Sequence, residues 1–153
     1  MVKPELLKSF SLFREMDNDQ LNEFTGYIQE RNYAEGAFIC CKGDPGGDLF
    51  LIKNGTVSVS LPLYRYDSQY KTIAELGRGN FFGELSFFDG QERSADIQAS
   101  SDVELLVLSR RDYDQIVKTD FHQGCLVQQK IIAALVGIIR QMNETYSSAG
   151  FLL

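Results

Sequence analysis

The stretch FFGELSFFDGQERSA, residues 81–95, differs from the sequence on either side of it. It interrupts an alternation of apolar and polar residues that is typical of short β-strands. It turns at Gly83 and places a carboxylate, Glu84, and a guanidinium, Arg93, at opposite ends of an apolar segment. These charges around a glycine make the stretch the candidate functional segment, and the flanking sequence is expected to hold it in place.

The residue types in this stretch suit a small cyclic phosphate that is attached to a sugar. A helical turn that begins at Gly83 offers free backbone N–H groups, with no side chain there to block close approach. Arg93 can donate two hydrogen bonds to a phosphate, and Ser94 adds a hydroxyl and a backbone N–H. Glu84 would repel a phosphate, so its expected role is to accept hydrogen bonds from sugar hydroxyls. In the empty site Glu84 and Arg93 are expected to pair, because a partly buried guanidinium needs a partner.

Short strands separated by glycine-rich turns are predicted on both sides of the stretch. Most of the thirteen glycines lie between Gly36 and Gly90. The expected strands cover residues 49–52, 57–61, 97–99 and 103–107, and turn signals lie at residues 43–47, 54–55 and 67–68. This rhythm predicts a β-sandwich, jelly roll or barrel over residues 31–109.

Helical patterns are predicted at both ends of the chain. In residues 1–30, Asp17 followed by Gln20 resembles a capping box. The apolar residues that recur there at helical spacing are Leu21, Phe24, Tyr27 and Ile28. Residues 110–146 contain a short amphipathic piece, Arg110 to Val117, and a long one from His122 to about Tyr146.

These patterns together predict one domain over residues 1–153. Its expected class is mainly β with flanking α. We expect a double-stranded β-helix, that is, a jelly-roll-like β-roll, with an N-terminal helix bundle and a long C-terminal helix.

The composition excludes several classes of protein. With 153 residues, 44% of them hydrophobic and 24% charged, the chain can form a core and is neither disordered nor fibrous. The formal net charge is −6 and the pI is about 4.8, so binding of nucleic acid to a basic face is not expected. His122 is the only histidine, so no metal site of the cupin type is expected.

The cysteines and the apolar segments indicate a cytoplasmic protein. Cys40 and Cys41 are poorly placed to pair with each other or to share a metal, because neighbours in a strand point to opposite faces. Together with Cys125, they are expected to be small buried residues in a reducing compartment. The N-terminus lacks the apolar segment of a secretory signal. The longest apolar run, Ile131–Ile139, is well short of the roughly 20 residues of a membrane helix, so no membrane segment is expected.

Residues 82–95 resemble the phosphate-binding cassette of cyclic nucleotide-binding domains, and Gly90–Ala95 is especially similar to the cassette of bacterial cAMP receptor proteins. The resemblance continues through the upstream segments 33–36, 43–46, 48–52 and 55–57, and extends from about Leu12 to about Glu144. It implies a regulatory domain that binds a cyclic nucleotide, requires no other cofactor and is not an enzyme.

The resemblance also implies a role for individual residues. The ligand-binding residues that it implies are Gly83, Glu84, Leu85, Ser86, Arg93 and Ser94. Glu84 would accept a hydrogen bond from the ribose 2′-hydroxyl, and Arg93 would pair with the exocyclic phosphate oxygens. Ser94 and the backbone amides of Leu85 and Ser86 would complete the phosphate cradle.

The base would lie against the long C-terminal helix, at Met142 and Asn143, if the receptor-protein pattern is followed along the chain with a one-residue gap. Family members with threonine directly after the arginine tend to accept cGMP. Serine at position 94 leaves cGMP open and favours cAMP.

The long helix carries two apolar stripes. The first comprises Ile131, Leu135, Ile138 and Met142, and the second comprises Ile132, Val136 and Ile139. One stripe is enough to dock a helix on its own domain, so the second predicts a partner. The same helix of a second subunit is the simplest partner, which predicts a homodimer; burial of both stripes within the monomer is the alternative.

Four functions compete. The first is a cyclic nucleotide sensor whose ligand moves the C-terminal helix. The second is the sensory half of a receptor-protein-type transcription regulator without its helix-turn-helix, and the third is a degenerate interaction module that has lost nucleotide binding. A cupin-type enzyme fits the strands but lacks metal ligands, and no residues support phosphodiesterase chemistry.

Overall fold

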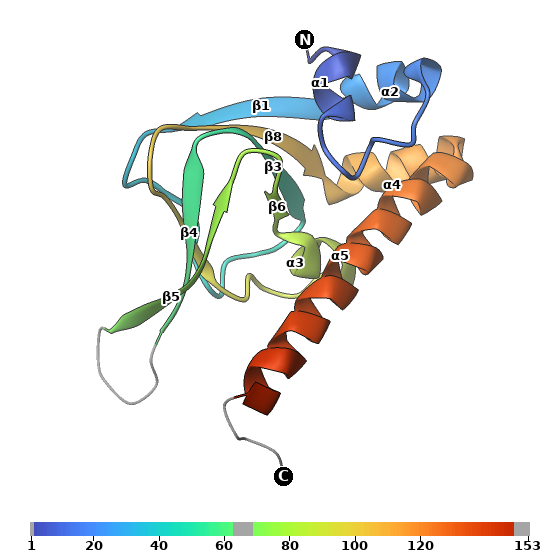
Figure 1. Cartoon of the computed structure of the whole chain (residues 1–153). Helices are drawn as coiled ribbons and strands as arrows, with labels where there is room; N and C mark the ends of the chain where they lie inside the picture. The colour runs from blue at the N-terminus through green and yellow to red at the C-terminus, as the bar shows by residue number, and fades with distance from the viewer. Residues whose placement is uncertain (1, 63–68, 149–153) are drawn as a thin grey trace.

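Eight strands form two four-stranded antiparallel sheets in the computed structural model, which describes residues 2–62 and 69–148 (Figure 1). The strands are β1 (Ile28–Tyr33), β2 (Phe38–Cys40), β3 (Asp48–Asn54), β4 (Thr56–Pro62), β5 (Tyr70–Gly77), β6 (Phe81–Phe82), β7 (Asp96–Ala99) and β8 (Val103–Ser109). The first sheet has the order β1-β8-β3-β6 and the second has the order β2-β7-β4-β5. The predicted class, mainly β with flanking helices, is confirmed.

Five helices surround this roll. They are α1 (Pro4–Lys8), α2 (Asn18–Thr25), α3 (Glu84–Asp89), α4 (Arg110–Thr119) and α5 (Phe121–Ser148). The predicted capping box of α2 is present, because the Gln20 amide donates to Asp17 Oδ1 at 2.9 Å and the Asp17 amide donates to Gln20 Oε1 at 3.0 Å. In Figure 1, α1 and α2 lie at one end of the roll, and α5 runs diagonally past α3.

One boundary differs from the prediction. Ile28 was expected in the N-terminal helix, but α2 ends at Thr25 and Ile28 opens β1 opposite Leu108 of β8. Its burial in the core therefore comes from strand pairing. The predicted turns at residues 43–47 and 54–55 are present, with left-handed glycines at Gly43, Gly47 and Gly55. The predicted turn at 67–68 lies outside the described residues.

The molecule has two hydrophobic cores separated by β3 and β8. Leu49, Leu51, Leu106 and Leu108 contribute to a core shared with the helices. The residues that alternate with them on the same strands contribute to a second core inside the roll. These are Phe50, Ile52, Leu105 and Val107. Because successive strand residues point to opposite faces, these two strands bury both of their faces.

The helix α5 is docked on the domain along its first half alone. Val127 and Ile131 are fully buried, whereas Ile132, Val136 and all described side chains beyond Val136 are exposed. The first apolar stripe therefore docks at Ile131 and partly at Leu135, and its outer half does not. The second stripe is exposed throughout.

The same helix passes a length-and-composition test for a membrane span. An 18-residue window within Phe121–Ser147 has a mean hydropathy of 1.3, and 11% of that window is buried. The expectation of no membrane segment rested on the longest unbroken apolar run. That run ends at the charged residues Lys130 and Arg140, and neutral residues beyond them, such as Gln129 and Gln141, lengthen the window without adding charge. This test is weak evidence, because the core helix of a soluble protein passes it too.

Candidate functional site

The cassette, residues 82–95, begins with a sharp bend at Gly83 between β6 and α3. Gly83 has φ of 85°, a left-handed conformation that disfavours other residues. A Cβ atom at this position would lie 2.7 Å from Arg93 Nη1 and 2.7 Å from the Asp48 carbonyl oxygen. The bend therefore needs glycine for its backbone conformation and for the close packing of the arginine against it.

Arg93 is the buried cation of the cassette, with 7% of its surface exposed. Its Nη1 lies 2.7 Å from Ser86 Oγ, 3.0 Å from the Asp48 carbonyl oxygen and 3.2 Å from the Gly83 carbonyl oxygen. The guanidinium carbon lies 5.3 Å from the ring centroid of Phe50, within cation–π range. Within the described residues, Nε and Nη2 make no hydrogen bond to protein, so these two donors are available to an anion.

The turn at residues 43–47 holds the loop that carries Arg93. The Arg93 amide donates to the Asp44 carbonyl at 2.8 Å, and the Gly43 amide donates to the Arg93 carbonyl at 2.9 Å. At Gly46 an added Cβ would lie 2.3 Å from the Ser86 Cβ, so this turn also packs directly on α3. The glycine-rich turn thus fixes both sides of the cassette.

Glu84 is the first residue of α3 and is partly buried. Burial raises the pKa of its carboxyl, while a hydrogen bond from its own backbone N–H and the charge of Arg93 lower it. A pairing of Glu84 with Arg93 was expected, but no ion pair between them occurs in the described structure. The reason is that the one guanidinium nitrogen with protein partners is taken up by two carbonyls and a hydroxyl, all neutral acceptors.

The remaining predicted site residues fall into two groups. Leu85, Ser86 and Ser94 belong to the cassette: Leu85 and Ser94 are exposed, and Ser86 is buried beneath Arg93. The first backbone hydrogen bond within α3 runs from the Phe87 amide to the Gly83 carbonyl, so the amides of Leu85 and Ser86 precede it.

The base contacts expected from α5 are not assembled with the cassette. Met142 is 49% exposed and Asn143 is also exposed, both in the outer half of α5. Among the described residues, no hydrogen bond or ring contact links either of them to the cassette. Their contact with a ligand stays a prediction.

The four phenylalanines of residues 81–88 are core residues. Phe87 is fully buried and Phe82 is 4% exposed, while Phe81 and Phe88 pack against the helical core. Phe87 and Phe88 each make an edge-to-face contact with Tyr113 of α4, with ring centroids 5.2 and 5.8 Å apart. Tyr113 in turn donates its hydroxyl to the Gly124 carbonyl of α5 at 3.0 Å.

Arg110 is a functional candidate that the sequence did not reveal. Its Nη1 donates to the carbonyls of Phe87 at 2.7 Å and Phe88 at 3.2 Å, and its Nε donates to Asp114 at 2.7 Å. Arg110 thus ties the C-terminal end of α3 to the start of α4. The one signal in the sequence was the position of Arg110 directly after Ser109, the residue that caps α4, which places Arg110 at the start of that helix.

The three cysteines are partly buried, whereas burial was expected. All three are free, and Cys40 packs against the core of the roll. Burial raises the pKa of the Cys40 thiol to about 11, although the charge of Arg93 opposes the shift. A thiol with such a pKa is protonated and unreactive at neutral pH.

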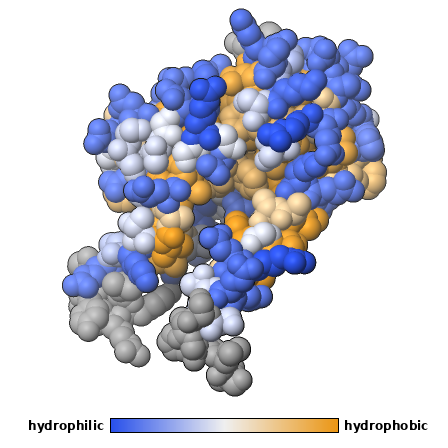
Figure 2. Space-filling model, viewed as in Figure 1, coloured by the Kyte–Doolittle hydropathy of each residue, from blue (hydrophilic) through white to orange (hydrophobic). Residues whose placement is uncertain are grey.

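The cassette can therefore bind a small anion with a hydroxyl-bearing neighbour. Arg93 supplies two unused donors, the first turn of α3 supplies amides, and Glu84 supplies a carboxylate acceptor. Figure 2 shows the surface hollowed between the roll and the lower part of α5, beside the position of α3 in Figure 1.

Comparison with known proteins agrees with this geometry. Residues 30–120 match the family model described as cyclic nucleotide-binding domain. The chain is 37% identical over 114 residues to the cyclic AMP receptor protein of Thermus thermophilus, covering 73% of this chain and 51% of that protein. The chain also matches cyclic nucleotide-gated potassium channels and cGMP-dependent protein kinases, of which it spans between 10% and 29%.

Two solved structures share the fold. A cyclic nucleotide-binding domain from Methylobacillus flagellatus matches with a TM-score of 0.82 and 28% identity, over 99% of this chain and 83% of that one. The catabolite activator protein of Thermus thermophilus matches with a TM-score of 0.79 and 32% identity, over 92% of this chain and 63% of that one. The chain spans about half the length of the first curated relative, so activities of the whole relatives are not carried over.

Proposed function

This chain belongs to the cyclic nucleotide-binding domain family, and on that premise we propose that it senses a 3′,5′-cyclic purine nucleotide, with cAMP favoured and cGMP the alternative. The observation that carries the proposal is the buried Arg93, held by neutral acceptors with two donors unused. A buried cation without a carboxylate partner is costly unless an anion compensates it.

The residues have distinct roles toward such a ligand. Arg93 and Ser94, with the amides of Leu85 and Ser86, bind the cyclic phosphate. Glu84 accepts a hydrogen bond from the ribose 2′-hydroxyl. The separation of cation and carboxylate in the cassette supports this division, because a phosphate placed against Glu84 would be repelled.

Ligand binding is transmitted to α5 in this proposal. The connection from the cassette runs from α3 through Arg110 and Tyr113 of α4 to Gly124 of α5. Met142 and Asn143 then close over the base. The ligand drives this movement by the amount by which it binds the closed state more tightly than the open state.

The domain performs no chemistry in this proposal and works in the cytoplasm. Its output passes to a partner domain or protein, as in the sensory half of a transcription regulator. Calorimetry that detects no binding of either nucleotide would instead favour the degenerate module.

The exposed half of α5 supports a second proposal, a homodimer through this helix. From Ile132 onward, the large hydrophobic residues that α5 exposes are Ile132, Val136, Ile138, Ile139, Met142 and Tyr146. A stripe at helical spacing along an extended helix matches the surface that another helix covers. A second copy supplies an identical stripe, which makes the interface self-complementary.

Calorimetric titration of the chain with cAMP, cGMP and 5′-AMP, side by side, tests the proposed ligand. We expect one cyclic nucleotide to bind saturably and 5′-AMP to bind more weakly. Arg93→Leu is expected to lower the affinity at least about a hundredfold, because two charge-assisted hydrogen bonds are lost. An unchanged affinity in a folded Arg93→Leu variant would overturn the assignment of the phosphate site.

A further inference from the structure

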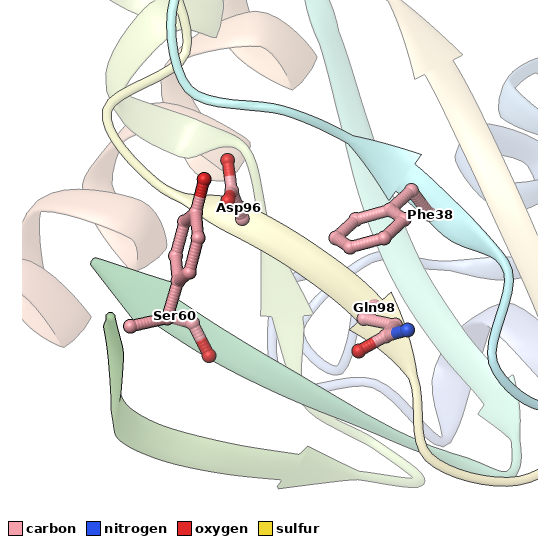
Figure 3. A pocket seen from close by; sticks show the side chains of 5 residues that line it. Phe38, Ser60, Asp96 and Gln98 are labelled. Atoms are coloured by element: carbon pink, nitrogen blue, oxygen red, sulfur yellow. The ribbon is translucent and has the colours of Figure 1, made fainter. Parts of the chain in front are cut away.

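A hollow lies on the outer face of the second sheet (Figure 3). Along β7, Ile97 and Ala99 point into the core of the roll, so Asp96 and Gln98 face outward. The β-register places Ser60 of β4 opposite Asp96 and Phe38 of β2 opposite Gln98. With Tyr70 of β5, these residues line a volume of about 170 Å³ that includes none of the predicted nucleotide-binding residues.

Two exposed aromatic rings contribute to the hollow. Phe38 is 55% exposed and Tyr70 is 59% exposed. Phe38 comes from one edge strand of the sheet and Tyr70 from the other, with β7 and β4 between them. Aromatic faces left in water on both edges of a concave surface are typical of a binding site.

The floor of the hollow carries a buried carboxylate. Asp96 is 8% exposed, and its Oδ1 accepts a hydrogen bond from the Lys42 amide at 2.6 Å. Gln98 donates its Nε2 to the Gly36 carbonyl at 2.8 Å, which directs the amide oxygen to the opposite side, over the sheet (Figure 3). Among the described residues, the polar groups that line the hollow are thus mainly acceptors, and none of these lining residues is a lysine or an arginine.

We propose that this hollow receives the guanidinium group of an arginine side chain from a partner protein. A guanidinium is planar, stacks on aromatic faces and carries only donors, so it matches Phe38 and Tyr70 at the sides and Asp96 and Gln98 on the floor. Its hydrogen bond to the Asp96 carboxylate is charge-assisted.

The shape of the hollow favours a side chain on a partner surface over a free small molecule. Pockets for small molecules enclose most of their ligand, whereas both rings here stay more than half exposed. The site also lies across a sheet with two edge strands, β2 and β5, where a second chain can lie alongside. The net charge of −6 attracts a basic partner.

Titration with short blocked peptides, followed by NMR, tests the proposal on the intact chain. The probe is acetyl-Gly-Arg-Gly-amide, and the matched control is the same peptide with citrulline, a neutral analogue of arginine. We expect saturable shifts at Phe38, Tyr70 and Gln98 with the arginine peptide, and at least about tenfold weaker binding of the citrulline peptide. Equal binding of the two peptides, or no saturable shift, would overturn the proposal.

Variants separate this site from the nucleotide site. Asp96→Asn keeps the acceptor for the Lys42 amide and removes the charge, and Phe38→Leu removes one ring from an exposed position that the fold does not need. Each is expected to weaken the arginine peptide at least about fivefold and to leave nucleotide affinity unchanged. Glu5→Gln, which removes an exposed charge in α1, is expected to leave both affinities unchanged. Peptide affinity that survives both Asp96→Asn and Phe38→Leu contradicts the assignment.

Discussion

At the scale of single residues, the cassette depends on contacts that admit little change. Gly83 and Arg93 approach each other so closely that the glycine has no room for a methyl group. Arg93 is buried among neutral acceptors, and Glu84 beside it is partly buried with a raised pKa. The burial of these two charged groups costs free energy in the empty site, and the proposed nucleotide would offset the cost for Arg93.

Gly83→Ala is expected to destabilise the domain by about 3 kcal/mol and to abolish nucleotide binding. The left-handed backbone costs about 1–2 kcal/mol for alanine, and the overlap with Arg93 and Asp48 adds to this cost. Gly90→Ala is the matched control, because Gly90 has φ of 70° but no atom within 4 Å of an added Cβ. Denaturant unfolding should give a loss of about 1 kcal/mol for Gly90→Ala. Equal losses would show that the close approach is unimportant.

Glu84→Gln is expected to raise the free energy of unfolding of the empty domain at pH 7. Burial raises the pKa of Glu84 in the folded state above its value of 4.5 in the unfolded chain. Between these two pKa values the folded state binds more protons, so ionisation of Glu84 lowers stability as the pH rises. The advantage of the glutamine variant should vanish below pH 4.5, as thermal unfolding at several pH values would show.

The same substitution should act in the opposite direction on ligand affinity. Loss of the carboxylate acceptor is expected to weaken cAMP about tenfold at pH 7. Affinity of the unmodified chain should fall as the pH drops through the raised pKa, and affinity of Glu84→Gln should not. A parallel pH dependence in the two proteins would remove Glu84 from the ligand site.

At the scale of elements, the helix α3 is held from both sides. The turn at residues 43–47 packs on its start, and Arg110 of α4 binds the carbonyls at its end. Phe87 anchors its middle in the helical core. The cassette and α4 contact each other through the side chains of Arg110 and Tyr113. The position of the cassette and the position of α4 therefore depend on each other.

Arg110→Leu is expected to destabilise the domain by about 1–2 kcal/mol, because two carbonyls of α3 lose their donor and Asp114 loses its partner. Hydrogen exchange should become faster at Phe87–Gly90 before it does in the strands. Arg111→Leu, at the exposed neighbouring position, should change stability by less than about 0.5 kcal/mol. If both variants behave alike, Arg110 does not connect the two helices.

The sequence allowed prediction of elements that a local pattern marks. The strands at residues 49–52 and 103–107 are short apolar segments between turn signals, and the capping box of α2 is a motif of two residues three positions apart. β1 and β5 carry mostly exposed residues, and their strand character comes from pairing with β8 and β4, which are distant in sequence. No local pattern records such pairing.

The candidate site was predictable to the same extent. Gly83 and Arg93 were found because residue types at a bend imply their chemistry. The contact of Arg110 with α3 was not, because its acceptors are backbone carbonyls, which any residue supplies. The expected Glu84–Arg93 pair failed for a related reason: neutral backbone and hydroxyl acceptors compete for the guanidinium, and the sequence does not show them.

At the scale of the whole molecule, one helix extends beyond the surface that it packs on. The described part of α5 after Val136 buries none of its side chains, although it carries Ile138, Ile139 and Met142. A continuous apolar stripe of this kind is uncommon on a monomer in water. The proposed homodimer would cover it.

Ile139→Gln is expected to weaken the homodimer at least about tenfold, since it places a polar group in the apolar stripe. Arg140→Gln, at the next exposed position, should leave self-association unchanged. Sedimentation velocity across a range of concentrations measures both. A monomer at high micromolar concentration contradicts the homodimer, and co-sedimentation with lipid vesicles would assign the stripe to a membrane instead.

The double-sided strands β3 and β8 separate two interiors, each with its own set of apolar residues. Phe87 of α3 belongs to the interior that the helices share, so the cassette is built into the helical side of this partition. A rearrangement of the helices therefore reaches the cassette directly, through a residue that both have in common, and does not have to pass through the inside of the roll.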